Sequence, residues 1–217
     1  MIVLRDVWKR FSGGPAVAQG ISAVFPGGQA TALLGCNGAG KSSLLAMLAG
    51  TLRPDAGRVE RGGTVSWPVG FAGAFHPDLT GAQNTRFVAR VYGVDSSGLL
   101  EFVRAVSGLE DAMRQPVRRY SSGMRARLGF AISMGIPFDM YLVDEVTAVG
   151  DAAFRRETAA LLKARLGQAG AIVVSHAPAQ LRAVCTAGAV LQEGRLRMFE
   201  DLEEAIAVYD KGLRVGA

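Results

Sequence analysis

The most constraining feature of this sequence is a glycine-rich loop between an apolar run and a helical pattern. Residues 35–42 are Gly-Cys-Asn-Gly-Ala-Gly-Lys-Ser and match the pattern G-x-x-x-x-G-K-[ST] in full. The preceding run, residues 30–34, has the character of a buried strand, and residues 41–52 carry leucines at helical spacing. A strand, a glycine loop and a helix in this order predict an α/β fold.

This loop, residues 35–42, is called the phosphate loop below. Its glycines let backbone N–H groups point inward at phosphate oxygens, and the N-terminus of the following helix adds positive potential. Lys41 supplies a cation for the β- and γ-phosphates, and the Ser42 hydroxyl is a ligand for Mg²⁺. The alternative is a glycine turn before an ordinary helix. The predicted nucleotide-binding residues are Gly35, Cys36, Asn37, Gly38, Ala39, Gly40, Lys41, Ser42 and Ser43.

A pair of acids follows a second apolar run. Residues 140–143 are strand-like and lead into Asp144 and Glu145. At the carboxyl edge of a parallel sheet, Asp144 can hold Mg²⁺ and Glu145 can activate water for attack on the γ-phosphate. The apolar run 171–174 leads to His176, a candidate charge stabiliser, and Asp151 follows closely enough to turn toward the same site. The alternatives are a solvated acid pair and a structural histidine.

The remaining pattern predicts one domain with two lobes. Strand-like runs lie at residues 2–8 and 21–25, a turn at 53–57, helices over most of 79–135 and a further helix at 153–166. We expect an α/β core formed by residues 1–76 and 137–217, rich in strands at its start. An inserted helical lobe is expected at 77–136.

Composition excludes several classes of protein. Hydrophobic residues make up 49% and charged residues 20%, which excludes a disordered chain. The net charge of +5 suits an anionic partner without choosing among nucleotide, nucleic acid and membrane. Cys36 and Cys185 do not form a disulfide framework, which favours a reducing compartment. The longest charge-free apolar stretch, residues 128–138, is about half of the roughly 20 residues needed to span a bilayer. We therefore expect a chain that is soluble or held at a membrane by a partner.

A hydroxyl-rich helix start forms a third candidate site. The segment Ser121-Ser122-Gly123-Met124, called the signature segment below, opens a helical pattern, with Ser121 or Ser122 as its N-cap. A free helix N-terminus binds anions. Five arginines lie around it: Arg114, Arg118, Arg119, Arg125 and Arg127. The alternative is a capped surface helix with a solvated basic face.

Along the chain come the phosphate loop, the signature segment, the acid pair, Asp151 and His176. This ordered set resembles the motifs of an ATP-binding-cassette (ABC) ATPase. The resemblance covers nearly the whole chain and implies a P-loop NTPase core of the ABC type that uses ATP and Mg²⁺, with Ser42 and Asp144 at the metal and Glu145 and His176 in catalysis. It also implies a head-to-tail dimer in which one copy's phosphate loop and the other's signature segment hold ATP. Phe11 corresponds to the family's adenine-stacking aromatic, and Asp151 ends the turn after the acid pair.

The sequence departs from the family pattern at two places. Ser122 stands where the family's signature has its first glycine, and Met124 where it has glutamine. The family also places a glutamine at the junction with the helical lobe, but none occurs between Gln29 and Gln83. Residues 67–76 occupy that junction. We expect Phe71 or Phe75, with His76, to form a floor for a docked permease helix, the alternative being that the segment is core.

These departures are similar to the ATPase subunits of capsular-polysaccharide exporters of Gram-negative bacteria, on residues 66–71, 120–130 and 141–151. O-antigen exporter ATPases often carry an added C-terminal carbohydrate-binding domain, for which this chain has no room. The resemblance implies a second copy of the chain, a membrane-spanning permease and a periplasmic adaptor as partners, with no nucleic acid. It places the subunit at the cytoplasmic face of the inner membrane, held through the permease.

Three alternatives remain open. The transported polymer is an O-antigen or teichoic acid in the first, and the chain is a soluble ABC ATPase of DNA repair or translation in the second. The third is a phosphate-loop kinase or GTPase, which leaves the signature segment unexplained; no Asn-Lys-x-Asp guanine motif is present.

Overall fold

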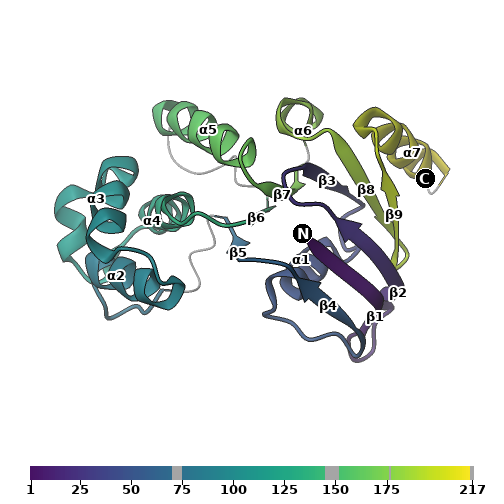
Figure 1. Ribbon diagram of the computed structural model, residues 1–217, viewed down its shortest axis with the longest axis horizontal. Helices are drawn as coiled ribbons and strands as arrows, with labels where there is room; N and C mark the ends of the chain where they lie inside the picture. The colour runs from purple at the N-terminus through teal and green to yellow at the C-terminus, as the bar shows by residue number, and fades with distance from the viewer. Residues whose placement is uncertain (70–74, 145–151, 176, 216–217) are drawn as a thin grey trace. The chain divides into compact units, whose positions relative to one another are not determined.

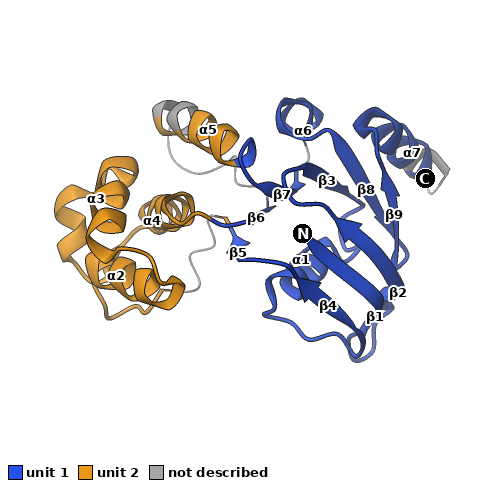
Figure 2. Cartoon of the chain, viewed as in Figure 1, with its two compact units in different colours: residues 1–68, 138–145, 166–217 blue, residues 69–137, 146–165 orange. Residues whose placement is uncertain are grey.

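The computed structural model describes residues 1–69, 75–144, 152–175 and 177–215 (Figure 1). The chain divides into two compact units (Figure 2). The first consists of Met1–Pro68, Phe138–Glu145 and Leu166–Ala217, and the second of Val69–Pro137 and Val146–Arg165. The second unit thus includes a segment beyond residues 77–136, the range expected for the helical lobe.

The first unit contains two sheets. The smaller is antiparallel, in the order β2-β1-β4, with strands β1 (Ile2–Arg10), β2 (Ala16–Phe25) and β4 (Ala56–Arg61). The larger has the order β5-β6-β7-β3-β8-β9. Its first five strands are parallel and β9 is antiparallel to β8. The strands are β5 (Val65–Pro68), β6 (Met140–Asp144), β7 (Gly170–Val174), β3 (Ala30–Leu34), β8 (Ala187–Gln192) and β9 (Arg195–Phe199).

Helix α1 (Lys41–Ala49) lies in the core between the two sheets (Figure 1). Its Leu44, Leu45, Met47 and Leu48 belong to one buried cluster with residues of both sheets, among them Phe25 of β2 and Leu191 of β8. The helix ends at Gly50, whose φ of 86° suits glycine, and Arg61 donates to the carbonyls of Met47 and Leu48, at 2.6 Å each. The opposite face of the larger sheet carries α6 (Pro178–Val184) and α7 (Leu202–Val215) (Figure 1).

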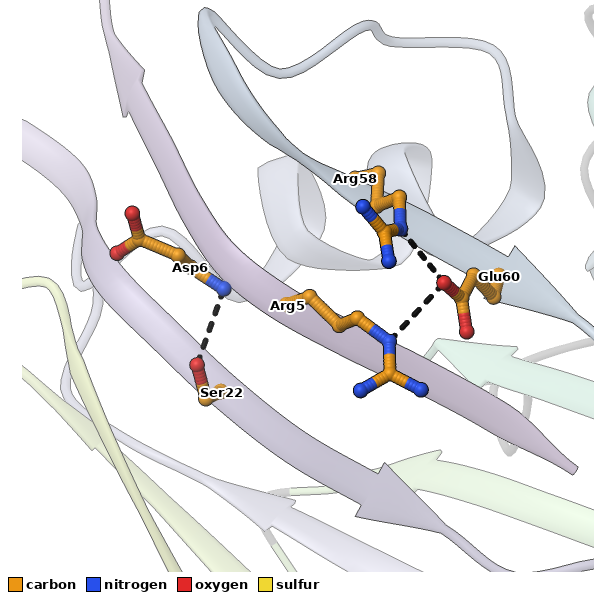
Figure 3. Close-up of polar contacts among 5 residues, drawn as sticks. All are labelled: Arg5, Asp6, Ser22, Arg58 and Glu60. Atoms are coloured by element: carbon orange, nitrogen blue, oxygen red, sulfur yellow. Dashed lines mark hydrogen bonds and ion pairs between the residues drawn. The ribbon is translucent and has the colours of Figure 1, made fainter.

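Polar contacts on the exposed side of the smaller sheet link its three strands (Figure 3). Glu60 Oε1 of β4 accepts from Arg5 Nε of β1 at 3.0 Å and from Arg58 Nε at 2.6 Å. The backbone N–H of Asp6 donates to Ser22 Oγ of β2 at 3.0 Å. Because these groups are exposed, their contribution to stability is small.

The second unit is helical. It contains α2 (Gly81–Tyr92), α3 (Ser96–Ser107), two short 3₁₀ turns (Glu110–Arg114 and Val117–Arg119), α4 (Ser122–Gly135) and most of α5 (Ala152–Leu166). Thr80 and Gln83 form a capping box at the start of α2. The aromatic rings of Phe130 on α4 and Phe154 on α5 pack edge to face, 6.1 Å apart.

The expected α/β fold is confirmed. The strands at residues 2–8, 21–25, 30–34, 140–143 and 171–174 are present, and helices occupy most of residues 79–135. Two details of the prediction were wrong. Helix α1 ends at Ala49 instead of residue 52, because Gly50 terminates it, and β4 begins at Ala56 inside the expected turn.

Candidate functional site

An open cleft of about 320 Å³ in the first unit contains the phosphate loop. Both sheets contribute to it. The loop follows β3 and Asp144 ends β6, both in the larger sheet, whereas Phe11 follows β1 and Val17 lies in β2, both in the smaller sheet. The lining residues are Phe11, Val17, Asn37, Gly38, Gly40, Lys41, Ser42, Ser43 and Asp144. The structure thus brings together most of the predicted nucleotide-binding residues of this unit.

The phosphate loop is held in place by close backbone packing. Strand β3, which leads into it, is buried along its whole length between β7 and β8. A Cβ at Gly35 would lie 2.6 Å from the carbonyl oxygen of Leu191, so only glycine fits there. Gly40 is the N-cap of α1 with a φ of 101°, and no side chain caps the helix. The first N–H groups of α1 therefore remain available to an anion.

The ammonium group of Lys41 bonds within the loop. Its Nζ donates to the carbonyl oxygens of Gly35 at 2.5 Å and Cys36 at 3.0 Å. The side chain is half-buried and lines the cleft. The cation is thus already placed at the loop.

Ser42 and Asp144 approach each other across the cleft. The Ser42 hydroxyl donates to Asp144 Oδ2 at 3.5 Å, joining the first turn of α1 to the end of β6. Among the described residues, no cluster of three or more His, Cys, Asp or Glu residues could hold a metal by itself. Two protein oxygens suit Mg²⁺, which at nucleotide sites completes its shell with waters and phosphate oxygens. The donor set therefore fits the predicted ion.

Three residues predicted to act at the γ-phosphate lie outside the described part of the chain. These are Glu145, Asp151 and His176. The residues before two of them are described. Asp144 ends β6, and Ser175 follows β7 with its hydroxyl donating to Gln180 Oε1 at 2.7 Å. Strands β6 and β7 are parallel neighbours, so residues 144 and 175 lie at the same edge of the sheet.

Phe11 lies at the rim of the cleft with 44% of its surface exposed. It follows β1 at the start of the turn toward β2, where Gly14 N–H donates to the Phe11 carbonyl at 3.1 Å. Val17 of β2 also lines the cleft, and a Cβ at Gly40 would lie 3.0 Å from the Val17 Cβ. Sequence reasoning missed Val17, because a valine in a strand has no local signal that distinguishes a cleft wall from core.

The signature segment opens α4 in the second unit. Ser121 is the N-cap, and its Oγ accepts from the backbone N–H of Met124 at 3.1 Å. This resolves the choice of cap between Ser121 and Ser122. Ser121, Ser122 and Gly123 are exposed and Met124 is half-buried, so the helix N-terminus is open to solvent.

Two of the five nearby arginines are engaged within the unit. Arg118 pairs with Asp78 at 2.6 Å, and the Arg127 guanidinium lies 4.6 Å from the centre of the Phe154 ring. Both contacts are consistent with the structural alternative for these side chains. The exposed Arg114 and Arg119 and the half-buried Arg125 complete the predicted cluster.

The junction segment is described in part. Trp67 belongs to β5 and packs edge to face on Phe138 at 5.6 Å. Phe75 is 8% exposed, which favours the core interpretation for this residue, whereas Phe71 lies outside the described residues. His76 is exposed, and its backbone is held by the buried Asn84 side chain through bonds of 2.9 and 3.1 Å. Gln83, the first glutamine after Gln29, is used in the capping box of α2.

Comparison with known proteins assigns the family. The model of the family described as "ABC transporter" matches residues 18–148, which include the phosphate loop, the signature segment and the acid pair. The chain belongs to the ABC transporter family. The family explains why the phosphate loop, the signature segment and the acid pair occur in this order on one α/β chain.

Curated relatives within the family match nearly the whole chain. The chain is 39% identical to "ATP-binding protein BexA" of Haemophilus influenzae over 214 residues, 97% of this chain and 99% of the relative. It is 40% identical to "Polysialic acid transport ATP-binding protein KpsT" of Escherichia coli over 215 residues, 96% of each. The "O-antigen export system ATP-binding protein RfbB" of Klebsiella pneumoniae is more distant, at 33% identity over 89% of this chain and 80% of that protein.

Solved structures agree on the fold. A dimeric ATP-binding cassette in a post-hydrolysis state, bound to ADP and Pi, superposes with a TM-score of 0.78 over 93% of this chain and 99% of that chain. Its sequence identity is 18%, so this likeness concerns the fold alone. Among the described residues, no helix has both the length and the apolar character needed to cross a bilayer.

Proposed function

We propose that this chain is the ATP-hydrolysing subunit of a membrane exporter for lipid-linked capsular polysaccharide. The observation that carries the proposal is the match to capsule-related ATP-binding proteins at about 40% identity over nearly the full length. The relatives from O-antigen and teichoic-acid export are 33–34% identical over shorter parts of this chain. The cleft around the phosphate loop supports the proposal, because residues predicted to bind the nucleotide line it.

ATP binds in the cleft of the first unit. The N–H groups of residues 35–43 surround the β- and γ-phosphates, and Lys41 exchanges its two carbonyl contacts for phosphate oxygens. The adenine ring stacks on the exposed Phe11. Ser42 and Asp144 would hold Mg²⁺, which would neutralise charge on the phosphates.

Hydrolysis uses residues at the carboxyl ends of β6 and β7. Glu145 accepts a proton from the attacking water while the water oxygen bonds to the γ-phosphorus. The bond between the γ-phosphorus and the bridging β–γ oxygen breaks, and ADP leaves. His176 stabilises charge on the γ-phosphate, and Asp151 helps to shape the site from the turn after Glu145. These three roles rest on the order of the residues in the sequence.

Two copies of the chain complete the site. In a head-to-tail dimer, the second copy's signature segment meets the γ-phosphate. Ser121, Ser122, Gly123 and Met124 offer hydroxyls and the N-terminus of α4. ATP binding closes the dimer, and hydrolysis reopens it. Because the ligand bridges two copies, ATP stabilises the dimer by mass action.

A separate permease supplies the path through the membrane, and this subunit binds to its cytoplasmic side at the inner membrane. A periplasmic adaptor completes the export complex. The alternatives are an exporter of O-antigen or teichoic acid and, less well supported, a soluble ABC ATPase.

The catalytic part of the proposal is tested with Glu145→Gln. This change keeps the shape of the side chain and removes the carboxylate that acts as the base. The variant is therefore expected to bind ATP and to hydrolyse it at least about 100-fold more slowly. MgATP is then expected to accumulate the dimer, as measured by light scattering. Lys41→Ala is the contrasting control, because it is expected to lose ATP binding. Turnover close to that of the unchanged protein, assayed with the permease present, would exclude Glu145 as the base.

The transport part is tested in a capsule-exporting strain that lacks its own ATPase subunit. Expression of this chain together with its permease is expected to restore capsule at the cell surface, and the Glu145→Gln chain is not. Restoration of O-antigen in an O-antigen export mutant, without restoration of capsule, would replace the proposal by the first alternative. Co-purification with ribosomes or nucleic acid instead of a membrane protein would favour the soluble ATPase.

A further inference from the structure

A lysine ammonium lies against the ring of Phe11. Lys9 Nζ is 5.5 Å from the centre of that ring, within the range of a cation–π interaction. The Lys9 side chain is only 14% exposed, whereas Phe11 is 44% exposed. The lysine therefore lies over one face of the ring, called the inner face below, and the opposite face is called the outer face.

Asp55 holds this lysine in place. Its Oδ1 accepts from Lys9 Nζ at 2.6 Å, and its Oδ2 accepts from the backbone N–H of Arg10 at 2.7 Å. The Asp55 N–H in turn donates to the Trp8 carbonyl at 2.8 Å. The Lys9 and Arg10 contacts lower the pKa of the Asp55 carboxyl, so it is ionised at neutral pH. The turn before β4 is thus bonded to the end of β1 where Phe11 emerges.

Phe11 would otherwise be poorly constrained. It is in a turn, outside the strands, and nearly half of it is in solvent. A side chain that is free to change rotamer loses conformational entropy when a ligand fixes it. A fixed cation on the inner face of the ring reduces that loss before the ligand arrives.

We propose that Lys9 and Asp55 are positioning residues for the nucleobase, fixing the Phe11 ring so that the base stacks on its outer face. The proposal rests on the proposed function, since it assumes that the cleft binds a nucleotide with its base at Phe11. It adds that affinity for the base depends on residues that themselves do not touch the nucleotide. Their effect is confined to the base because the phosphates bind at the other end of the cleft, through the loop.

The test compares two ligands on the full chain. Lys9→Met keeps the length of the side chain and removes its charge, and we expect it to weaken MgATP binding about three- to tenfold. Binding of magnesium tripolyphosphate, which has no base, is expected to stay the same. Lys9→Arg keeps a cation that stacks on aromatic rings and is expected to restore ATP affinity. Asp55→Asn is expected to act in the same direction as Lys9→Met. Arg53→Met, in the same turn, is the control for loss of one exposed positive charge.

A double variant separates positioning from long-range attraction. In a Phe11→Ala background, Lys9→Met is expected to have no further effect on ATP affinity, because the ring through which it acts is gone. Equal losses for ATP and tripolyphosphate, or an unchanged loss in the Phe11→Ala background, would overturn the proposal. Thermal unfolding without ligand identifies variants that are simply destabilised.

Failure of the proposed function gives a different result. If Lys41→Ala leaves ATP and tripolyphosphate binding intact, the cleft is not the phosphate site. If Phe11→Ala leaves ATP affinity unchanged, the base does not stack there. If Lys41→Ala and Phe11→Ala both behave as proposed but Lys9→Met does not, the proposed function stands and only the positioning role of Lys9 is excluded.

Discussion

The two cysteines occupy opposite environments. Cys36 is exposed in the phosphate loop, and it also lines an open cavity that contains Leu191 and Gly212. Cys185 is buried just after α6, and burial raises the pKa of its thiol to about 12. Because the thiolate is the reactive form, the two residues should differ sharply toward electrophiles.

We therefore expect a maleimide at neutral pH to modify Cys36 and to leave Cys185 unmodified until the chain unfolds. MgATP is expected to protect Cys36, since the phosphates cover the loop in which it lies. Mass spectrometry of tryptic peptides after timed labelling measures both rates, with Cys36→Ser as the control. Labelling of Cys36 at one rate with and without MgATP would show that nucleotide does not cover its thiol.

The role of a residue can be predicted from the sequence when the residues that act together are neighbours in the chain. The phosphate loop is predictable because its glycines, Lys41 and Ser42 are contiguous and each has a chemical reason to be there. Lys9 and Asp55 were not predictable, because they are 46 residues apart and meet only when β1 pairs with β4. The roles of Glu145 and His176 remain predictions from the sequence.

At the scale of the element, the two serines at the start of α4 differ in whether their side chains cap the helix. Ser121 Oγ accepts the Met124 N–H, whereas Ser122 is exposed. We expect Ser121→Ala to lower the free energy of unfolding by about 1 kcal/mol, the usual effect of losing an N-cap, and Ser122→Ala to have little effect. Urea denaturation followed by circular dichroism measures both. Equal effects of the two substitutions would show that the cap does not contribute as its geometry indicates.

The packing of α7 on the larger sheet depends on a glycine. A Cβ at Gly188 of β8 would overlap the Cβ of Ala205 on α7. Gly188→Ala is therefore expected to destabilise the chain by about 1–3 kcal/mol, as overpacking does. Ala205→Gly in the same chain removes the overlap and is expected to recover part of the loss, apart from about 1 kcal/mol for glycine in a helix. If Ala205→Gly and Gly188→Ala simply add in denaturation experiments, the two residues do not clash.

Sequence predicted several apolar strands and the helices with clear helical spacing, but it predicted no element beyond His176, so α6, β8, β9 and α7 were missed. The fully apolar strands β3 and β7 and the helices of the second unit lie close to the expected ranges. Strand β4 was missed because its sequence, Ala-Gly-Arg-Val-Glu-Arg, is mostly charged or small, as an exposed edge strand can be. Strand β5 was missed because four residues are too few to show a period.

At the scale of the whole molecule, a head-to-tail dimer makes a distinctive prediction about mixtures. Lys41→Ala removes the phosphate loop's cation, and Gly123→Asp adds a repelling carboxylate at the start of α4. Each chain alone, in the Glu145→Gln background, is expected not to dimerise with MgATP. Mixed together, they are expected to form heterodimers, because one of the two sites then combines an intact loop with an intact signature segment. Light scattering of the mixture measures this.

The control is a chain that carries both substitutions, mixed with the Lys41→Ala chain. No intact loop is present in that mixture, so no dimer is expected. If the first mixture also fails to dimerise while unchanged Glu145→Gln chains do, each copy uses its own signature segment and the head-to-tail arrangement is wrong.

The topology of the larger sheet bears on how such a chain can change in length. Strands β5, β6 and β7 are consecutive in the chain, parallel and adjacent. Parallel neighbours need a crossover connection. Residues 69–137, the larger part of the second unit, are the crossover from β5 to β6, and residues 146–165 lie in the crossover from β6 to β7. The helical unit is therefore two enlarged loops of the sheet. Insertions or deletions there can change its size without shifting the register of any strand, so surfaces on this unit can diversify while the phosphate loop stays in place.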